Sequence, residues 1–229
     1  MQLYITPCIV TMPPSCSDML VVPSNERLVG TQFSHFPVGG PTPAAIYIGE
    51  RPLHPNTPPP PPRPLDWSLY QCEAVDGVVT ELSGTNIKNI KARAPVLNHD
   101  AMYPIRCPAG QAVSIPSSGS LSGVFPAGLI LTVAPFWPGQ PSKTWQRVLS
   151  SAYRETLSAA QDTNTSGSLA LPLLGAGARG APVEHAAAVA SSVVASNLLT
   201  HKRVIFCCQD DDIAETLDLA LRRHLPWTH

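Results

Sequence analysis

The sequence predicts a three-layer α/β domain built on a mixed central sheet. After Arg106, short aliphatic segments alternate with longer segments whose apolar residues recur at helical spacing. The aliphatic segments are apolar throughout, as expected of strands that are covered on both faces. The chain of 229 residues is long enough for one good core, so we expect a single domain over residues 1–229.

The individual elements follow from hydrophobic periodicity and from capping residues. Segments rich in aliphatic and β-branched residues predict strands, and amphipathic stripes predict helices. Adjacent Cys207 and Cys208 lie in one such strand segment, where neighbouring side chains point to opposite faces. In chain order, we expect strands at 3–11, 19–22, 129–133, 168–172 and 203–208, and helices at 145–161, 182–198 and 210–221.

Residues 50–106 are predicted to form a Pro-rich and polar insertion. The uninterrupted proline run at 58–62 cannot donate hydrogen bonds to a strand neighbour, so it predicts a polyproline II arm on the surface. Residues 75–82 are interpreted as a hairpin, followed by a polar span without regular structure. The arm is either a tolerated surface insertion or a docking arm for a protein partner with an aromatic groove.

Composition restricts the partners and the compartment. Lys and Arg total 15 against 16 Asp and Glu, so the charge balance favours no broad nucleic-acid surface and leaves nucleic acid only local contacts. No apolar run approaches the roughly 20 residues that span a bilayer, so we expect no membrane partner. The six cysteines show no CxxC pairing, which indicates a reducing environment without a structural metal. These features predict an intracellular protein, cytoplasmic or mitochondrial.

The most informative segment is a strand that leads through a glycine loop into a helix, at 168–187. Its glycines can adopt positive φ or let a ligand approach the backbone, and Pro182 suits a first helical turn. Loop amides and the helix dipole then favour an anion such as a diphosphate. The residues predicted to present these donors are Leu174, Gly175, Ala176, Gly177, Ala178, Arg179 and Gly180.

Two other interpretations of this loop are open. It can be an ordinary glycine-rich turn with no ligand. The sequence GAGARG at 175–180 also fits the GxGxxG fingerprint of dinucleotide-binding folds. That fingerprint normally opens the first βαβ unit, whereas here only one predicted strand and helix follow it, so we consider it the weaker interpretation.

Five sequence blocks follow one another after residue 106: CPAGQA at 107–112, LILTVAP at 129–135, LSSAYRETL at 149–157, SLALPLLGAGARGAP at 168–182 and RVIFCCQDDD at 203–212. A sixth block, SDMLVVPSNERLVG, lies upstream at 17–30. No single block is specific enough, but in their order and spacing they resemble the macrodomain family, the ADP-ribose-binding module of cellular and viral proteins.

The resemblance implies a binding site and assigns several residues to it. Asn25 matches an asparagine that the family uses near the distal ribose, and Gly39 and Gly40 match the glycine-rich loop that follows it. Arg179 stands where relatives carry an aromatic residue over that ribose. It can pair with a phosphate or be a solvated loop residue. The implied ligand is ADP-ribose, a related nucleotide diphosphate, or an ADP-ribosylated protein.

The chain also departs from the family, which argues against catalysis. Val22 replaces the first asparagine of the family signature, and the loop at 39–47 offers no carboxylate for a general base. At the adenine end, Ile9 or Val10 replaces an aspartate, and Gln209 stands where many relatives stack an aromatic ring. We therefore expect a non-hydrolytic binder with no catalytic residue, no cofactor and no metal. The alternatives are a macrodomain-type ADP-ribosyl ester hydrolase, or a ligand-free structural subunit of a larger assembly such as a mitochondrial ribonucleoprotein.

Overall fold

The domain is organised around one mixed six-stranded sheet. The computed structural model describes residues 2–5, 9, 17–28, 75–97, 104–163, 167–177, 179–197 and 203–224. Within these ranges the strand order is β1-β6-β5-β2-β4-β3. All neighbouring strands are parallel except β3 and β4. The strands are β1 (Gln2–Ile5), β2 (Met19–Pro23), β3 (Ala112–Ile115), β4 (Gly128–Thr132), β5 (Ser168–Pro172) and β6 (Arg203–Cys208).

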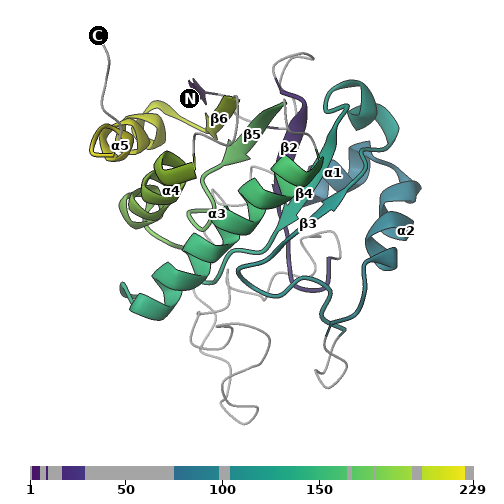
Figure 1. Cartoon of the computed structure of the whole chain (residues 1–229), viewed down its shortest axis with the longest axis horizontal. Coiled ribbons are helices and arrows are strands. Elements are labelled where there is room, and N and C mark those ends of the chain that lie inside the picture. Colours follow the sequence, from purple (N-terminus) through teal and green to yellow (C-terminus); the bar gives the residue numbers. More distant parts are fainter. Residues whose placement is uncertain are drawn as a thin grey trace, which may run out of the picture.

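Helices cover both faces of this sheet and make the three layers that the sequence predicted (Figure 1). One face packs against α3 (Lys143–Thr163), α4 (Val183–Asn197) and α5 (Asp211–Arg222). The other face packs against α1 (Val75–Leu82) and α2 (Thr85–Arg93), together with a 3₁₀ turn at Gly119–Gly123.

Alternating strand residues build the two cores. In β6, Phe206 and Cys208 are buried on the α3–α5 face, whereas Cys207 is buried on the α1–α2 face. This confirms the prediction that the two adjacent cysteines point to opposite sides of one strand. Similarly, Met19 and Val21 of β2 pack in the first core while Leu20 and Val22 pack in the second. The central strands are therefore apolar along most of their length, because both of their faces are covered.

The hairpin predicted at 75–82 is wrong, because this segment is helix α1. Its valines favoured a strand by intrinsic preference, but Val75, Val78, Val79 and Leu82 also recur at i, i+3, i+4 and i+7. Val79 is fully buried and Val75 and Val78 are partly buried in the core on this face of the sheet, whereas Leu82 is exposed, so packing of the three valines favours the helix. The polar span that follows is helical as well, since it contains α2 with the buried Ile87.

A buried ion pair joins these two helices. The Lys91 Nζ atom lies 2.6 Å from Oδ1 of Asp76, and both side chains are almost completely buried. A buried charge needs such a partner, because desolvation of a single ion is costly. Residues 75–97 of the predicted insertion are thus part of the packed domain, whereas the proline run at 58–62 lies outside the described residues.

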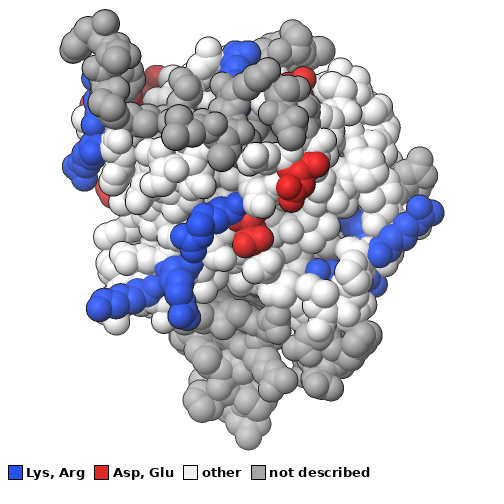
Figure 2. Space-filling model, viewed as in Figure 1, with Lys and Arg blue, Asp and Glu red and all other residues white. Residues whose placement is uncertain are grey.

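The surface over α3 carries both signs of charge. Figure 2 shows Lys and Arg side chains interspersed with Asp and Glu on this face, with broad uncharged areas between them. None of the helices in the described ranges is both long enough and apolar enough to cross a membrane.

Candidate functional site

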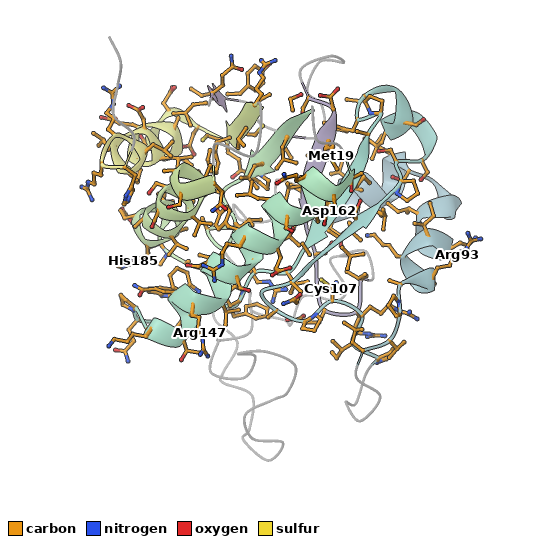
Figure 3. All side chains as sticks on the ribbon, viewed as in Figure 1. Met19, Arg93, Cys107, Arg147, Asp162 and His185 are labelled. Carbon is orange, nitrogen blue, oxygen red and sulfur yellow. The ribbon has the colours of Figure 1, made fainter. Side chains whose placement is uncertain are left out.

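The carboxyl ends of β2, β4 and β5 lie at the same edge of the sheet, because these strands are parallel neighbours. Three connections therefore meet there, at residues 24–28, 133–138 and 173–182. In Figure 3, Met19 marks the amino end of β2, and Cys107 lies toward the opposite, carboxyl end of the sheet. In parallel α/β sheets, ligands bind beyond the carboxyl ends of the strands, so this edge is the candidate site.

The glycine loop after β5 is a compact turn closed by its own backbone. The Gly180 N–H donates to the Gly177 carbonyl at 2.8 Å, and the Ala181 N–H donates to the Gly175 carbonyl at 2.9 Å. Gly175 and Gly180 have φ values of 92° and 76°, in the region that favours glycine. The loop then enters α4 at Val183, as the sequence predicted for this segment.

Several amides of this loop are left without a backbone acceptor. Among the described residues, the N–H groups of Gly175, Ala176, Gly177 and Arg179 make no backbone hydrogen bond. Gly177 is exposed, and a Cβ atom built on it meets no atom of the described residues within 4 Å. Successive unpaired amides before a helix N-terminus form a concavity that suits an anion. The loop therefore offers donors and open space at the same point.

A buried tyrosine fixes the start of the loop. The hydroxyl of Tyr153, on α3, accepts a hydrogen bond of 2.9 Å from the Leu174 N–H. Burial raises the pKa of Tyr153 well above its ordinary value, so the hydroxyl stays protonated. The side chains of Leu149 and Trp145 lie beneath Gly175, at 3.5 and 3.9 Å from the position of its Cβ. The start of the loop is thus packed against helix α3.

Aromatic side chains continue this support toward α4. Trp137 packs edge-on against Trp145, with ring centroids 4.7 Å apart, and stacks on His185 at 5.1 Å. Its backbone N–H donates to the Arg179 carbonyl at 2.8 Å. The connection after β4 is therefore attached to the glycine loop by main-chain and ring contacts.

Arg179 extends from the glycine loop to the turn after β2. Its Nη2 atom donates to the Ser24 carbonyl at 3.1 Å and lies 3.7 Å from Oε2 of Glu26. Its guanidinium carbon lies 4.2 Å from the centre of the Phe136 ring, a cation–π arrangement. Burial lowers the pKa of Arg179 and the Glu26 carboxylate opposes this shift. The side chain is only 13 % exposed, so the interpretation as a solvated loop residue is wrong.

The turn that carries Asn25 is held by main-chain contacts on several sides. Ser24 N–H donates to the Thr132 carbonyl at 2.8 Å, and the Asn25 carbonyl accepts from Leu28 N–H at 2.9 Å. The Glu26 carbonyl accepts from the amides of Arg106 and Cys107, at 2.8 and 3.0 Å. Asn25 is partly buried and thus occupies a fixed position at the same edge of the sheet as the glycine loop.

The other predicted site residues fall in different places. Gly39, Gly40 and Ala178 lie outside the described residues, so their roles stay predictions. Ile9 is buried in the core and Gln209 is exposed, so neither supplies the carboxylate or aromatic ring that the resemblance implied for these positions. Val22 is fully buried and faces the α1–α2 core.

Sequence reasoning missed the partners of Arg179. Glu26 lies within the block at 17–30 and Phe136 directly follows the block at 129–135, but nothing local in the sequence pairs them with a residue that lies far along the chain. The signal in the sequence was the opposite charge of two predicted site segments, because Glu26 follows Asn25 and Arg179 lies in the glycine loop. Strand pairing between β2 and β5 is what brings the two charges together.

The described residues offer no cluster of three or more His, Cys, Asp or Glu side chains that could hold a metal ion. Cys107, whose N–H donates to the Glu26 carbonyl, is buried, and burial together with Glu26 raises the pKa of its thiol to about 12. A thiol with such a pKa is protonated and unreactive near neutral pH. The arrangement is therefore suited to binding an anion through main-chain amides rather than to nucleophilic chemistry by this thiol.

Comparisons with known proteins agree with this architecture. Residues 68–190 match the family model of the Macro domain. The chain is 34% identical over 158 residues to the O-acetyl-ADP-ribose deacetylase of Citrobacter koseri, covering 67% of this chain and 82% of that protein. It is 32% identical over 139 residues to a Macro domain-containing protein of Methanosarcina mazei, covering 59% of this chain and 71% of the relative.

A solved structure shows the same fold. The Oceanobacillus iheyensis macrodomain with ADP superposes with a TM-score of 0.63 at 17% identity, over 96% of this chain and 89% of that one. The family match, the two sequence relatives and the shared fold all lead to one conclusion. The chain belongs to the macro domain family.

Proposed function

We propose that this macrodomain binds ADP-ribose, or a closely related nucleotide diphosphate, with its diphosphate on the glycine loop after β5. The observation that carries the proposal is the run of loop amides without a backbone acceptor at Gly175, Ala176 and Gly177, among the described residues. An anion placed there gains several hydrogen bonds without any lysine. The ADP in the Oceanobacillus iheyensis structure supports a nucleoside diphosphate as the ligand class.

Asn25 is the residue that we assign to the sugar beyond the diphosphate. Its turn and the glycine loop leave the same edge of the sheet, and Arg179 joins them directly. An asparagine amide can both donate to and accept from ribose hydroxyls. The natural ligand can be free ADP-ribose or the same group attached to a protein.

We further propose that the domain binds without hydrolysing. Glu26 is the carboxylate of the Asn25 turn, and it lies 3.7 Å from the Arg179 guanidinium. In this position the carboxylate contacts a guanidinium, and we propose that it does not act as a general base on a water. The relative named O-acetyl-ADP-ribose deacetylase favours a second candidate, hydrolysis of an ADP-ribosyl ester at the same site.

Calorimetric titration with ADP-ribose tests the binding proposal, with a matched pair of glycine variants. Gly177→Val places a side chain in the open space above the loop, so we expect the wild type to bind in the micromolar range and the variant to lose at least about tenfold in affinity. Gly123→Val is the control, because a Cβ there also meets nothing within 4 Å but the residue precedes the amino end of β4.

The outcomes separate the candidates. Equal affinity in both variants, or no binding by the wild type, contradicts the proposal. Release of acetate from O-acetyl-ADP-ribose by the wild type, abolished in Gly177→Val and retained in Gly123→Val, establishes the hydrolase instead of the binder.

A further inference from the structure

Besides its main-chain contacts, the turn that carries Asn25 is held by a side chain from the glycine loop. Arg179 Nη2 contacts the residue before Asn25, through the Ser24 carbonyl, and the residue after it, through the Glu26 carboxylate. The two contacts bracket Asn25 in the sequence. Any displacement of the guanidinium therefore changes the constraint on the backbone of Asn25 directly.

Arg179 is itself fixed at both its backbone and its side chain. Its carbonyl accepts from the Trp137 N–H at 2.8 Å, and its guanidinium lies over the Phe136 ring. A planar guanidinium can stack on a ring and donate in its own plane at the same time, which an ammonium group cannot do. The arrangement therefore depends on arginine and not on positive charge alone.

The Asn25 turn also contains a strained residue that needs external support. Leu28 has a φ of 57°, in the left-handed region that costs a residue with a Cβ atom about 1–2 kcal/mol. Such strain persists only where surrounding contacts hold the backbone. The main-chain bonds from Thr132, Arg106 and Cys107 provide part of this support, and Arg179 provides the part that comes from the glycine loop.

We infer that Arg179 is a positioning residue that sets the selectivity of the site between two kinds of nucleoside diphosphate. The favoured ligand carries a sugar beyond the second phosphate, as ADP-ribose does, and the other ends at that phosphate, as ADP does. This inference rests on the proposed function. The glycine-loop amides serve the diphosphate that both ligands share. The Asn25 turn serves only the additional sugar, and Arg179 fixes that turn relative to the loop.

The test compares ADP with ADP-ribose by calorimetry on the wild type and on Arg179→Ala, Arg179→Lys and Glu26→Gln. Loss of the bridge frees the Asn25 turn, so we expect Arg179→Ala to weaken ADP-ribose about tenfold while ADP changes less than about threefold. Arg179→Lys keeps the charge but cannot stack and donate together, so selectivity should not return. Glu26→Gln should reduce selectivity by a smaller factor, because the Ser24 contact remains.

Each outcome of this test supports or overturns the inference. Equal weakening of both ligands overturns the inference, since it makes Arg179 a phosphate ligand or a general support of the loop. Unchanged selectivity in Arg179→Ala, or full rescue by Arg179→Lys, overturns it as well. If ADP and ADP-ribose both fail to bind the wild type, the proposed function fails and the inference fails with it. ADP binding without preference for ADP-ribose in the wild type contradicts the inference alone.

Discussion

The two ends of the paired strands β2 and β5 use their polar groups in opposite ways. At the amino end, Asp18 Oδ2 accepts from the backbone N–H and the hydroxyl of Ser168, at 2.7 and 2.8 Å. The Asp18 N–H and the Ser17 hydroxyl in turn donate to the Ser168 carbonyl. At the carboxyl end, the amides of Gly175, Ala176 and Gly177 have no backbone acceptor in the described structure.

This contrast separates structural from ligand-binding polar groups. The amino end closes on itself, so its hydrogen bonds hold the strands in register and leave little for a ligand. At the carboxyl end, Tyr153 and Trp137 support the loop from outside, and the amides of residues 175–177 take no part in the backbone bonds that close it. Changes at the amino end should therefore affect stability alone, and changes at the carboxyl end should affect binding.

The largest effect on stability is expected from Asp18→Ala. The variant removes the acceptor of two hydrogen bonds, one of them from a backbone amide, and hydrogen bonds to charged groups contribute about 1.5–3 kcal/mol. We expect the free energy of unfolding to fall by about 2 kcal/mol in urea denaturation, with unchanged ADP-ribose affinity in the folded fraction. As a control, Asp210→Ala removes the cap that accepts from Ile213 N–H and should cost about 1 kcal/mol. A loss of ADP-ribose affinity in folded Asp18→Ala would contradict the claim that the amino end of the strands affects stability alone.

Gly175→Ala should lower both the stability of the domain and its affinity for ADP-ribose. The φ of 92° disfavours any residue with a Cβ atom, so we expect a loss of about 1–2 kcal/mol in stability. Relief of this strain rotates the neighbouring amides away from their common point, which lowers ADP-ribose affinity. Gly177→Ala is the matched control for stability, because Gly177 lacks a positive φ and a Cβ built there meets no described atom within 4 Å. If the two alanine variants unfold at the same temperature, the positive φ of Gly175 does not determine the stability of the loop.

Tyr153→Phe tests whether the loop is supported from α3. The variant leaves the buried Leu174 N–H without its acceptor, so we expect a loss of about 1 kcal/mol and a moderate loss of affinity. Tyr4→Phe on the exposed edge strand removes a hydroxyl of the same kind without this contact and should change neither. Unchanged amide chemical shifts for Gly175 in Tyr153→Phe would show that α3 does not position the loop.

The buried thiols have the smallest expected effect on stability near neutral pH. Burial raises the pKa of Cys107 to about 12 and that of Cys208 to about 11, from an ordinary value of 9.0. Between the unfolded and folded pKa values, the native state binds more protons than the unfolded state, so stability falls as pH rises above about 9. Below that pH both states are protonated and the thiols cause no dependence.

Denaturation at pH 8 and pH 10 measures this effect, with Cys107→Ala as the variant that should flatten the decline. Rapid reaction of native Cys107 with a thiol reagent at pH 8 would contradict the burial on which this prediction rests.

Local patterns predicted most of the fold, including the segment on which the proposed site is centred. The strand, glycine loop and helix at 168–187 are encoded by adjacent residues, so they could be predicted from the sequence alone. The segment at 75–82 was misinterpreted because valine favours strands and only its packing against the sheet selects the helix. The contact between Arg179 and Glu26 could not be predicted, because it depends on the pairing of β2 with β5.

Amide chemical shifts during a titration with ADP-ribose test the central claim most directly, because they report each backbone N–H separately. The account predicts the largest changes at Gly175, Ala176 and Gly177, where the described structure leaves donors without a backbone acceptor, and little change at Asp18 and Ser168 at the other end of the strands. Saturable changes centred away from the glycine loop, or none at millimolar ligand, would contradict it.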